Sequence, residues 1–186
     1  MRELARARPD YQKSGGSEDR RSLANGFRTP YPTKGRRLPY EVRSVIHTGI
    51  TVSDLDEALR FWTEVLGFES LGSGEFGGTF VEGSIGVPRA HVRVAMVSKD
   101  GASIELAQFT APEDRKTMRP RPCDVGSFHV AVEVDDIEAV AEACAGYGWD
   151  MPGRIETYSE GSLAGTKVVY LFNDDGTVIE LIQLLA

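Results

Sequence analysis

The sequence predicts an α+β fold made of two tandem βαβββ modules with mostly antiparallel strands. The stretch SKDGASIELAQF (98–109) aligns with NDDGTVIELIQL (173–184) at a constant shift of 75 residues. The stretch IHTGITVSDLDEA (46–58) aligns with FHVAVEVDDIEAV (128–140) at a shift of 82 residues. Each copy passes from a strand-like run to a helical period and then back to strand-like runs. This order is typical of a repeated α+β unit.

Composition and charge narrow the class of protein. The chain has 186 residues, of which 41% are hydrophobic and 26% charged, as in ordinary globular proteins. The net charge of -7 argues against nucleic acid as a partner, because phosphate binding needs a clustered positive face. No apolar run approaches the roughly 20 residues that cross a bilayer, and no apolar segment of a secretory signal follows the N-terminal arginines. The two cysteines lack a CxxC spacing, so we expect a reducing compartment and a cytoplasmic protein.

Charge also divides the chain along its length. Residues 1–43 hold 11 Lys/Arg against 5 Asp/Glu, a net of +6, whereas residues 44–186 hold 10 against 23, a net of -13. The basic segment contains Gly, Pro and Ser without an apolar period, which predicts a partly disordered N-terminal arm. A free tail and an arm lying on the acidic body both fit this pattern. We expect the first module at 44–110, a linker with three prolines at 111–125, and the second module at 126–186.

Each module begins with a strand followed by a helix. The strands are SVIHTGITV (44–52) and GSFHVAVEV (126–134), and Asp54 and Asp136 stand where helix N-caps are expected. Apolar residues then recur at helical spacing over 55–66 and over 137–144. Gly67 ends the first helix, and the second ends near Gly146 or Gly148.

Strands follow the helix in each module. We expect them over GTFVEG (78–83), HVRVAMVS (91–98) and GTKVVYLFN (165–173), followed by a hairpin that closes at an Asp-Gly turn. The Gly-rich stretches GSGEFGG (72–78) and SEGSLAG (159–165) are typical of loops, and such loops also act as lids over binding sites.

Strand alternation predicts which side chains face away from the helices. In the first strand of each module, Ile46 or Phe128 should pack on the helix, and His47 or His129 should point to the opposite face. In the last strand, the I-E-L motif puts its central glutamate on that same opposite face. The four residues that this alternation groups are His47, Glu105, His129 and Glu180.

A charged glutamate inside an apolar strand is costly unless it is paired, hydrogen-bonded or bound to a metal. One interpretation is two separate His–Glu hydrogen bonds, one in each module. The other is one centre, in which a pseudo-two-fold axis joins two imidazoles and two carboxylates as ligands of a borderline divalent cation. We favour the metal site, because repeat symmetry and strand alternation select the same four residues.

The body of the chain, roughly residues 44–186, resembles the vicinal oxygen chelate superfamily. The resemblance rests on IHTGITVSDLDEALRFWTEVLGFE, FHVAVEVDDIEA and FNDDGTVIELIQ. It implies paired βαβββ modules that form a cupped sheet around one divalent metal ion per site. It places the metal ligands at His47, Glu105, His129 and Glu180, a set similar to that of bacterial glyoxalase I. Zn, Ni, Co and Mn are the expected ions, ahead of Fe.

The chemistry that these residues favour is proton abstraction next to a carbonyl. A divalent ion that chelates vicinal oxygens stabilises the enediolate formed when the α-proton leaves. We expect Glu105 and Glu180 to be catalytic as well as metal ligands, with one loosening from the metal to carry the proton. The predicted function is therefore a metal-dependent isomerase, an epimerase acting on a small cyclic or sugar-like hydroxyketone or on an acyl-CoA thioester.

Three other functions fit the same fold. They are a glyoxalase I-type lyase on a thiol hemithioacetal, a ring-cleaving or other dioxygenase, and a non-catalytic drug-binding resistance protein. The expected partners are a small-molecule substrate and, from the resemblance, a second copy of the chain in a homodimer. Neither nucleic acid nor a membrane is expected. Whether the modules pair within one chain or between two chains is left open by the sequence.

Overall fold

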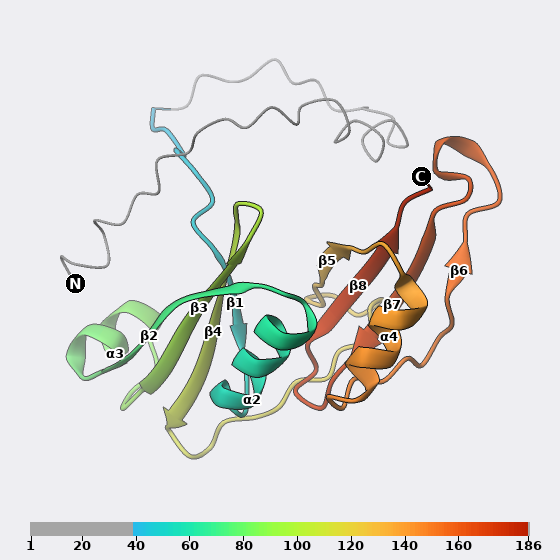
Figure 1. Ribbon diagram of the computed structural model, residues 1–186. Coiled ribbons are helices and arrows are strands. Elements are labelled where there is room, and N and C mark those ends of the chain that lie inside the picture. The colour runs from blue at the N-terminus through green and yellow to red at the C-terminus, as the bar shows by residue number, and fades with distance from the viewer. Residues whose placement is uncertain (1–38, 186) are drawn as a thin grey trace.

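The computed structural model describes residues 39–185 and contains two four-stranded sheets side by side (Figure 1). The strands of the first sheet are β1 (Thr48–Thr51), β2 (Glu69–Gly77), β3 (His91–Lys99) and β4 (Ala102–Ala111). The strands of the second are β5 (Val130–Glu133), β6 (Glu156–Thr157), β7 (Lys167–Phe172) and β8 (Val178–Gln183). Apart from 39–43, which are exposed, the predicted N-terminal arm lies outside the described residues.

The two sheets have the same topology. Their strand orders are β1-β4-β3-β2 and β5-β8-β7-β6. The first strand of each module pairs in parallel with the last, and all other pairs are antiparallel. The predicted α+β fold of two βαβββ units is therefore confirmed. Among residues 39–185, no helix is long and apolar enough to cross a membrane.

The helices begin where the sequence indicates. Asp54 caps α2 (Leu55–Arg60) by accepting a hydrogen bond from the Glu57 N–H at 2.9 Å. Asp136 caps α4 (Ile137–Ala145) in the same way through Ala139 at 3.0 Å. Such caps contribute about 1 kcal/mol each. The first helix continues as a π-helical segment, η1 (Phe61–Val65), before Gly67 turns the chain with a φ of +66°.

The chain between α2 and β3 differs from the prediction. The stretch GTFVEG forms most of helix α3 (Thr79–Ile85), and the preceding GSGEFGG, expected as a loop, belongs largely to β2. Strand β2 pairs with β3 along its whole length, so backbone pairing outweighs the poor strand propensity of its glycines. In helix α3, the side chain of Val81 is buried in the cluster that contains Val92 and Ala107, and this packing stabilises the helix. The GSL of the second Gly-rich stretch forms a single 3₁₀ turn, η2 (Gly161–Leu163).

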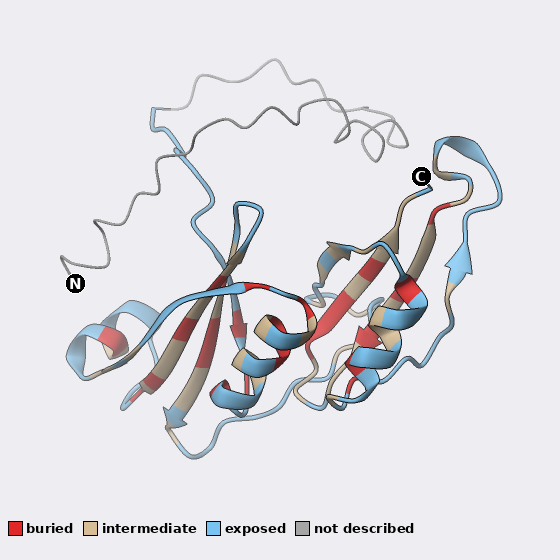
Figure 2. Cartoon of the chain, in the orientation of Figure 1, coloured by how far each residue is buried: buried red, intermediate tan, exposed pale blue. Residues whose placement is uncertain are grey.

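One hydrophobic core joins the two modules. It lies between the sheets and the helices α2, η1 and α4, which cover the same side of the molecule in Figure 1. Phe61 of η1 stacks on Trp149, with ring centroids 4.5 Å apart, and Trp62 beside it is 1% exposed. Figure 2 shows the buried positions along the strands and on the inward helix faces. The modules of one chain are thus fixed to each other through their helix side.

A second, smaller apolar cluster covers the opposite face of the first sheet. Its buried members are Val81, Ala90, Val92 and Ala107. The packing predicted for Ile46 and Phe128 is wrong, since these residues are 73% and 51% exposed. Both lie just before the short first strand of their module, outside the stretch that the helix covers.

Candidate functional site

The first His–Glu pair lies at the junction of β1 and β4. His47 directly precedes β1, and Glu105 stands in the middle of β4, where it is in register with Gly49. Ile104 and Leu106 are buried on the helix side at 2% and 0% exposure, so Glu105 points to the other face. The His47 Nε2 and Glu105 Oε1 atoms are 3.9 Å apart, and about a third of each side chain is exposed.

The second pair repeats this arrangement in the other module. His129 directly precedes β5, and Glu180 stands in β8 in register with Ala131. The His129 Nε2 and Glu180 Oε2 atoms are 3.1 Å apart, and the Glu180 side chain is 15% exposed. The strand alternation inferred from the sequence therefore places each histidine beside its expected glutamate.

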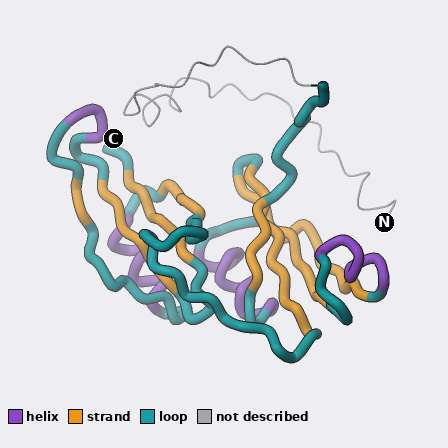
Figure 3. The backbone as a smooth tube through the Cα atoms, turned by 180° about the vertical axis from the view of Figure 1, so that it is seen from behind, coloured by secondary structure: helices purple, strands orange, loops and turns teal. Residues whose placement is uncertain are grey.

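The two pairs do not meet within one chain. Over residues 39–185, no group of three or more His, Cys, Asp or Glu side chains is close enough to hold a metal ion. Figure 3 shows the molecule from the side opposite α2 and α4, where the two sheets remain separate. A single chain thus presents two separate His–Glu pairs, each with two donor groups, which are called the first and second half-site as candidates.

A tyrosine accompanies the second pair and was missed by the sequence analysis. Tyr170 of β7 is in register with Glu180, and its ring lies edge-on to His129 with centroids 5.1 Å apart. Burial, followed by the negative charge of Glu180, raises the pKa of the Tyr170 phenol above its usual value. In the first module, Met96 holds the same place opposite Glu105. The register of the two Asp-Gly hairpins is the signal that identifies both neighbours.

The walls beside the two half-sites differ in polarity. In the first sheet, the apolar cluster of Val81, Val92 and Ala107 continues the face that carries Glu105. A separate cavity of about 630 Å³ lies between the two modules, lined by Thr51 and Phe109, by Phe128 and Asp175, and by the linker with Glu113, Arg115 and Lys116. The first half-site therefore adjoins an apolar wall, whereas the second adjoins a phenol.

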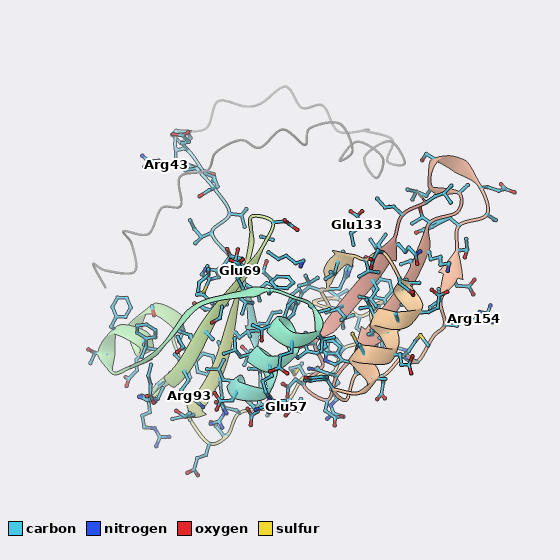
Figure 4. All side chains as sticks on the ribbon, viewed as in Figure 1. Arg43, Glu57, Glu69, Arg93, Glu133 and Arg154 are labelled. Atoms are coloured by element: carbon cyan, nitrogen blue, oxygen red, sulfur yellow. The ribbon has the colours of Figure 1, made fainter. Side chains whose placement is uncertain are left out.

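His91 and several arginines lie away from both His–Glu pairs. Arg93 pairs with Asp56 near the start of α2, at the same end of the first sheet as Glu57 (Figure 4). The other surface ion pairs of arginines are Arg119–Asp174, Arg121–Asp124 and Arg154–Glu156. His91 contacts Thr110 at 3.0 Å and Glu75 at 3.5 Å, with its ring against Gly77. None of these contacts brings an arginine or His91 into either half-site.

Comparison with known proteins agrees with the fold and the repeat. The family described as the glyoxalase/bleomycin resistance protein/dioxygenase superfamily matches residues 46–170. The chain is 36% identical over 157 residues to a 2-epi-5-epi-valiolone epimerase from Actinomyces sp., covering 82% of this chain and 85% of that protein. It is 30% identical over 141 residues to a probable lactoylglutathione lyase from Vibrio parahaemolyticus, covering 75% and 89%. A glyoxalase family protein from Bacillus cereus has the same fold, with a TM-score of 0.70, 22% identity and coverage of 80% and 98%.

Proposed function

Since this chain belongs to the glyoxalase/bleomycin resistance protein/dioxygenase superfamily, we propose that it is a metal-dependent epimerase of a small hydroxyketone. The observation that carries the proposal is the pair of matched half-sites, each with one imidazole and one carboxylate on the same sheet face. The 36% identity to an enzyme named as an epimerase of 2-epi-5-epi-valiolone supports a cyclic ketone as substrate class.

The complete site in this proposal is shared between two chains. The helix side of each module is already occupied by the other module of the same chain, through Phe61 and Trp149. The faces that carry the His–Glu pairs are exposed along β1 and β5, and the exposed Ile46 and Phe128 flank them at equivalent repeat positions. A symmetric homodimer joins the first half-site of one chain to the second of its partner, and forms two equal sites.

The donor groups fit a divalent cation. Ligand atoms about 2.0–2.2 Å from one ion lie roughly 3 Å from each other. The separation of 3.1 Å between His129 Nε2 and Glu180 Oε2 meets this requirement, whereas the 3.9 Å between His47 Nε2 and Glu105 Oε1 requires these two side chains to come closer when the ion binds. When bound, such an ion withdraws electrons from a substrate carbonyl and stabilises the negative charge that develops on its oxygen.

In this proposal the histidines bind the metal ion and the glutamates transfer the proton. The imidazoles of His47 and His129 hold the ion in their neutral form. A carboxylate oxygen of one glutamate accepts the proton from the carbon next to the carbonyl, and the carbon keeps the bonding electrons. A proton then returns to the opposite face of that carbon, which inverts its configuration without net oxidation or reduction.

A glyoxalase-type lyase is the second candidate function. The His/Glu/His/Glu set and the 30% identity to a probable lactoylglutathione lyase favour it. Like the epimerase, the lyase removes a proton from the carbon next to a carbonyl. The lyase then delivers the proton to the neighbouring carbon of a thiol hemithioacetal. The two functions therefore differ in substrate and product and share the carboxylates.

Proton exchange in deuterated water tests the proposal. The purified protein, loaded with Ni²⁺, Zn²⁺, Co²⁺ or Mn²⁺, is incubated with 2-epi-5-epi-valiolone, and NMR follows deuterium at the carbon next to the ketone. We expect exchange and a second epimer, both lost in Glu105→Gln and Glu180→Gln and retained in Glu142→Gln, an exposed control on α4. Turnover of only the hemithioacetal would favour the lyase, and ligand binding without exchange would overturn both.

Mixing inactive variants tests whether the site is shared. A His47→Ala chain and a His129→Ala chain each lack one half-site, but their heterodimer contains one complete site. Random exchange of subunits then restores about a quarter of the sites. A mixture of His47→Ala with Glu105→Gln, both in the first half-site, should remain inactive. Equal inactivity of both mixtures, with subunit exchange verified, would show that each site lies within one chain.

A further inference from the structure

The two half-sites have the same backbone but different neighbours. In the second, the residue opposite the glutamate across the antiparallel pair is Tyr170, and in the first it is Met96. On the parallel side, Ala131 flanks Glu180, and Gly49 flanks Glu105. The repeat therefore supplies two equivalent carboxylates whose freedom to move is unequal.

Glu180 is closely surrounded. Its carboxylate lies 3.1 Å from His129, whose ring is in edge-on contact with Tyr170. The side chain is 15% exposed, against 33% for Glu105. A phenol carries an O–H donor, whereas an ionised carboxylate only accepts hydrogen bonds. Tyr170 is thus chemically matched to hold Glu180 in one orientation.

Glu105 has open space on one side and no hydrogen-bond donor opposite it on the other. The thioether of Met96 offers no hydrogen-bond donor. A Cβ atom built onto Gly49 would meet nothing within 4 Å, so the flank of Glu105 on β1 is open. Its oxygen is also farther from its histidine, at 3.9 Å. Across the antiparallel register, Glu105 therefore faces a residue without a donor, whereas Glu180 faces the phenol of Tyr170.

We propose that Tyr170 is a positioning residue whose phenol holds Glu180 as the fixed carboxylate, and that Glu105 is the carboxylate that loosens to carry the proton. This inference rests on the proposed function and specifies which of the two glutamates moves. Tyr170 acts through Glu180, because its hydroxyl orients a metal ligand. Partners of this kind change metal affinity by about 10- to 100-fold when they are removed.

The test compares Tyr170→Phe with Met96→Leu, its counterpart in the other half-site. Zn²⁺ affinity is measured by competition with a chelator, and the visible spectrum of the Co²⁺-loaded protein reports the ligand geometry. We expect Tyr170→Phe to weaken Zn²⁺ binding about 10- to 100-fold and to change the Co²⁺ spectrum. Met96→Leu should change neither. Because Tyr170→Phe keeps the ring, a role limited to packing would leave both measurements unchanged and would overturn the inference.

The glutamate variants complete the test. Glu180→Gln should lose more Zn²⁺ affinity than Glu105→Gln, and Glu105→Gln should keep the metal while it loses proton exchange. The reverse order of affinities would overturn the division between the two carboxylates and leave the proposed function standing. A wild-type protein that binds no divalent metal and exchanges no proton would overturn the proposed function together with this inference.

Discussion

The rings of Phe61 and Trp149 stack with centroids 4.5 Å apart and an angle of 22° between their planes. Phe61 belongs to η1 of the first module, and Trp149 follows α4 of the second. Both are buried, at 3% and 5% exposure. The contact joins the two modules on the side away from the His–Glu pairs, and these two pairs stay apart within one chain.

This stack should stabilise the packing of the two modules against each other. We expect Trp149→Ala to lower the free energy of unfolding by about 3–5 kcal/mol, as for other buried aromatic residues. The double variant with Phe61→Ala should show a coupling of about 0.5–1.5 kcal/mol. Urea unfolding followed by circular dichroism measures both. Phe80→Ala, at 62% exposure, is the control and should stay within about 0.5 kcal/mol of wild type.

The exposed apolar residues before β1 and β5 should stabilise the proposed dimer. Burying one such side chain contributes about 1.5–3 kcal/mol, so Ile46→Asp and Phe128→Asp should each raise the dimer dissociation constant by about 10- to 100-fold or more. Sedimentation velocity over a concentration series measures this change, with circular dichroism to confirm folding. Phe80→Asp on α3 is the control. A monomeric wild type, or three variants with the same dissociation constant, would contradict the prediction.

The repeat explains how much of the fold could be predicted from the sequence. The matched I-E-L motifs and the two Asp caps depend on local periodicity, and both modules follow it. Helix α3 could not be predicted in this way, because TFVEGSI has strand-like residues and becomes helical through the burial of Val81 in a tertiary cluster. The predicted module boundaries remain a prediction.

The candidate site was predictable only in part, for a similar reason. Strand alternation assigns His47, Glu105, His129 and Glu180 to one kind of face, and each histidine lies beside its glutamate. How the modules pair depends on contacts distant in sequence, such as the hydrogen bond from the Ser53 N–H to Asp175 at 2.9 Å. The shared metal site therefore remains a proposal, and the role of Tyr170 required the register of β7 with β8.

The two cysteines should differ sharply in reactivity. Cys123 is exposed in the linker, whereas Cys144 is buried on α4, and burial raises the pKa of its thiol from 9.0 to about 11. Only the thiolate reacts with disulfide reagents. We expect one thiol per chain to react at pH 8 in the native protein, and two in denaturant. Two rapidly reacting thiols without denaturant would contradict the burial of Cys144.

Burial of the Cys144 thiol should also make the free energy of unfolding depend on pH. In the unfolded chain, Cys144 ionises above about pH 9, while in the folded chain it stays protonated up to about pH 11. The contribution of this pKa difference to the free energy of unfolding is therefore complete below pH 9 and decreases as the pH rises from 9 to about 11. The difference in urea midpoint between wild type and Cys144→Ala, measured across this range, should decrease with rising pH. A constant difference would contradict the prediction.

Equivalent glutamines in the two modules should differ in their importance for stability. The Gln183 Oε1 atom accepts a hydrogen bond at 3.1 Å from the N–H of Ile137, a residue with 0% exposure at the start of α4. Gln108, its repeat counterpart, donates through Nε2 to the carbonyl of Ser53 at 2.7 Å, and Ser53 is exposed. Removing the partner of a buried polar group costs about 1–3 kcal/mol, whereas water replaces the partner of an exposed one.

The same substitution at both positions isolates this difference. Methionine matches glutamine in length but has no amide, so Gln183→Met should lower the free energy of unfolding by about 1–3 kcal/mol. Gln108 Oε1 also accepts a hydrogen bond from Arg93 at 3.0 Å, and Arg93 keeps its ion pair with Asp56 when this bond is lost. Because water can replace both partners of Gln108, Gln108→Met should cost less than about 0.5 kcal/mol. Gln183→Glu, which restores an acceptor, should recover part of the loss. Urea unfolding measures all three, and equal losses for the two methionine variants would show that burial at the start of α4 does not decide the cost.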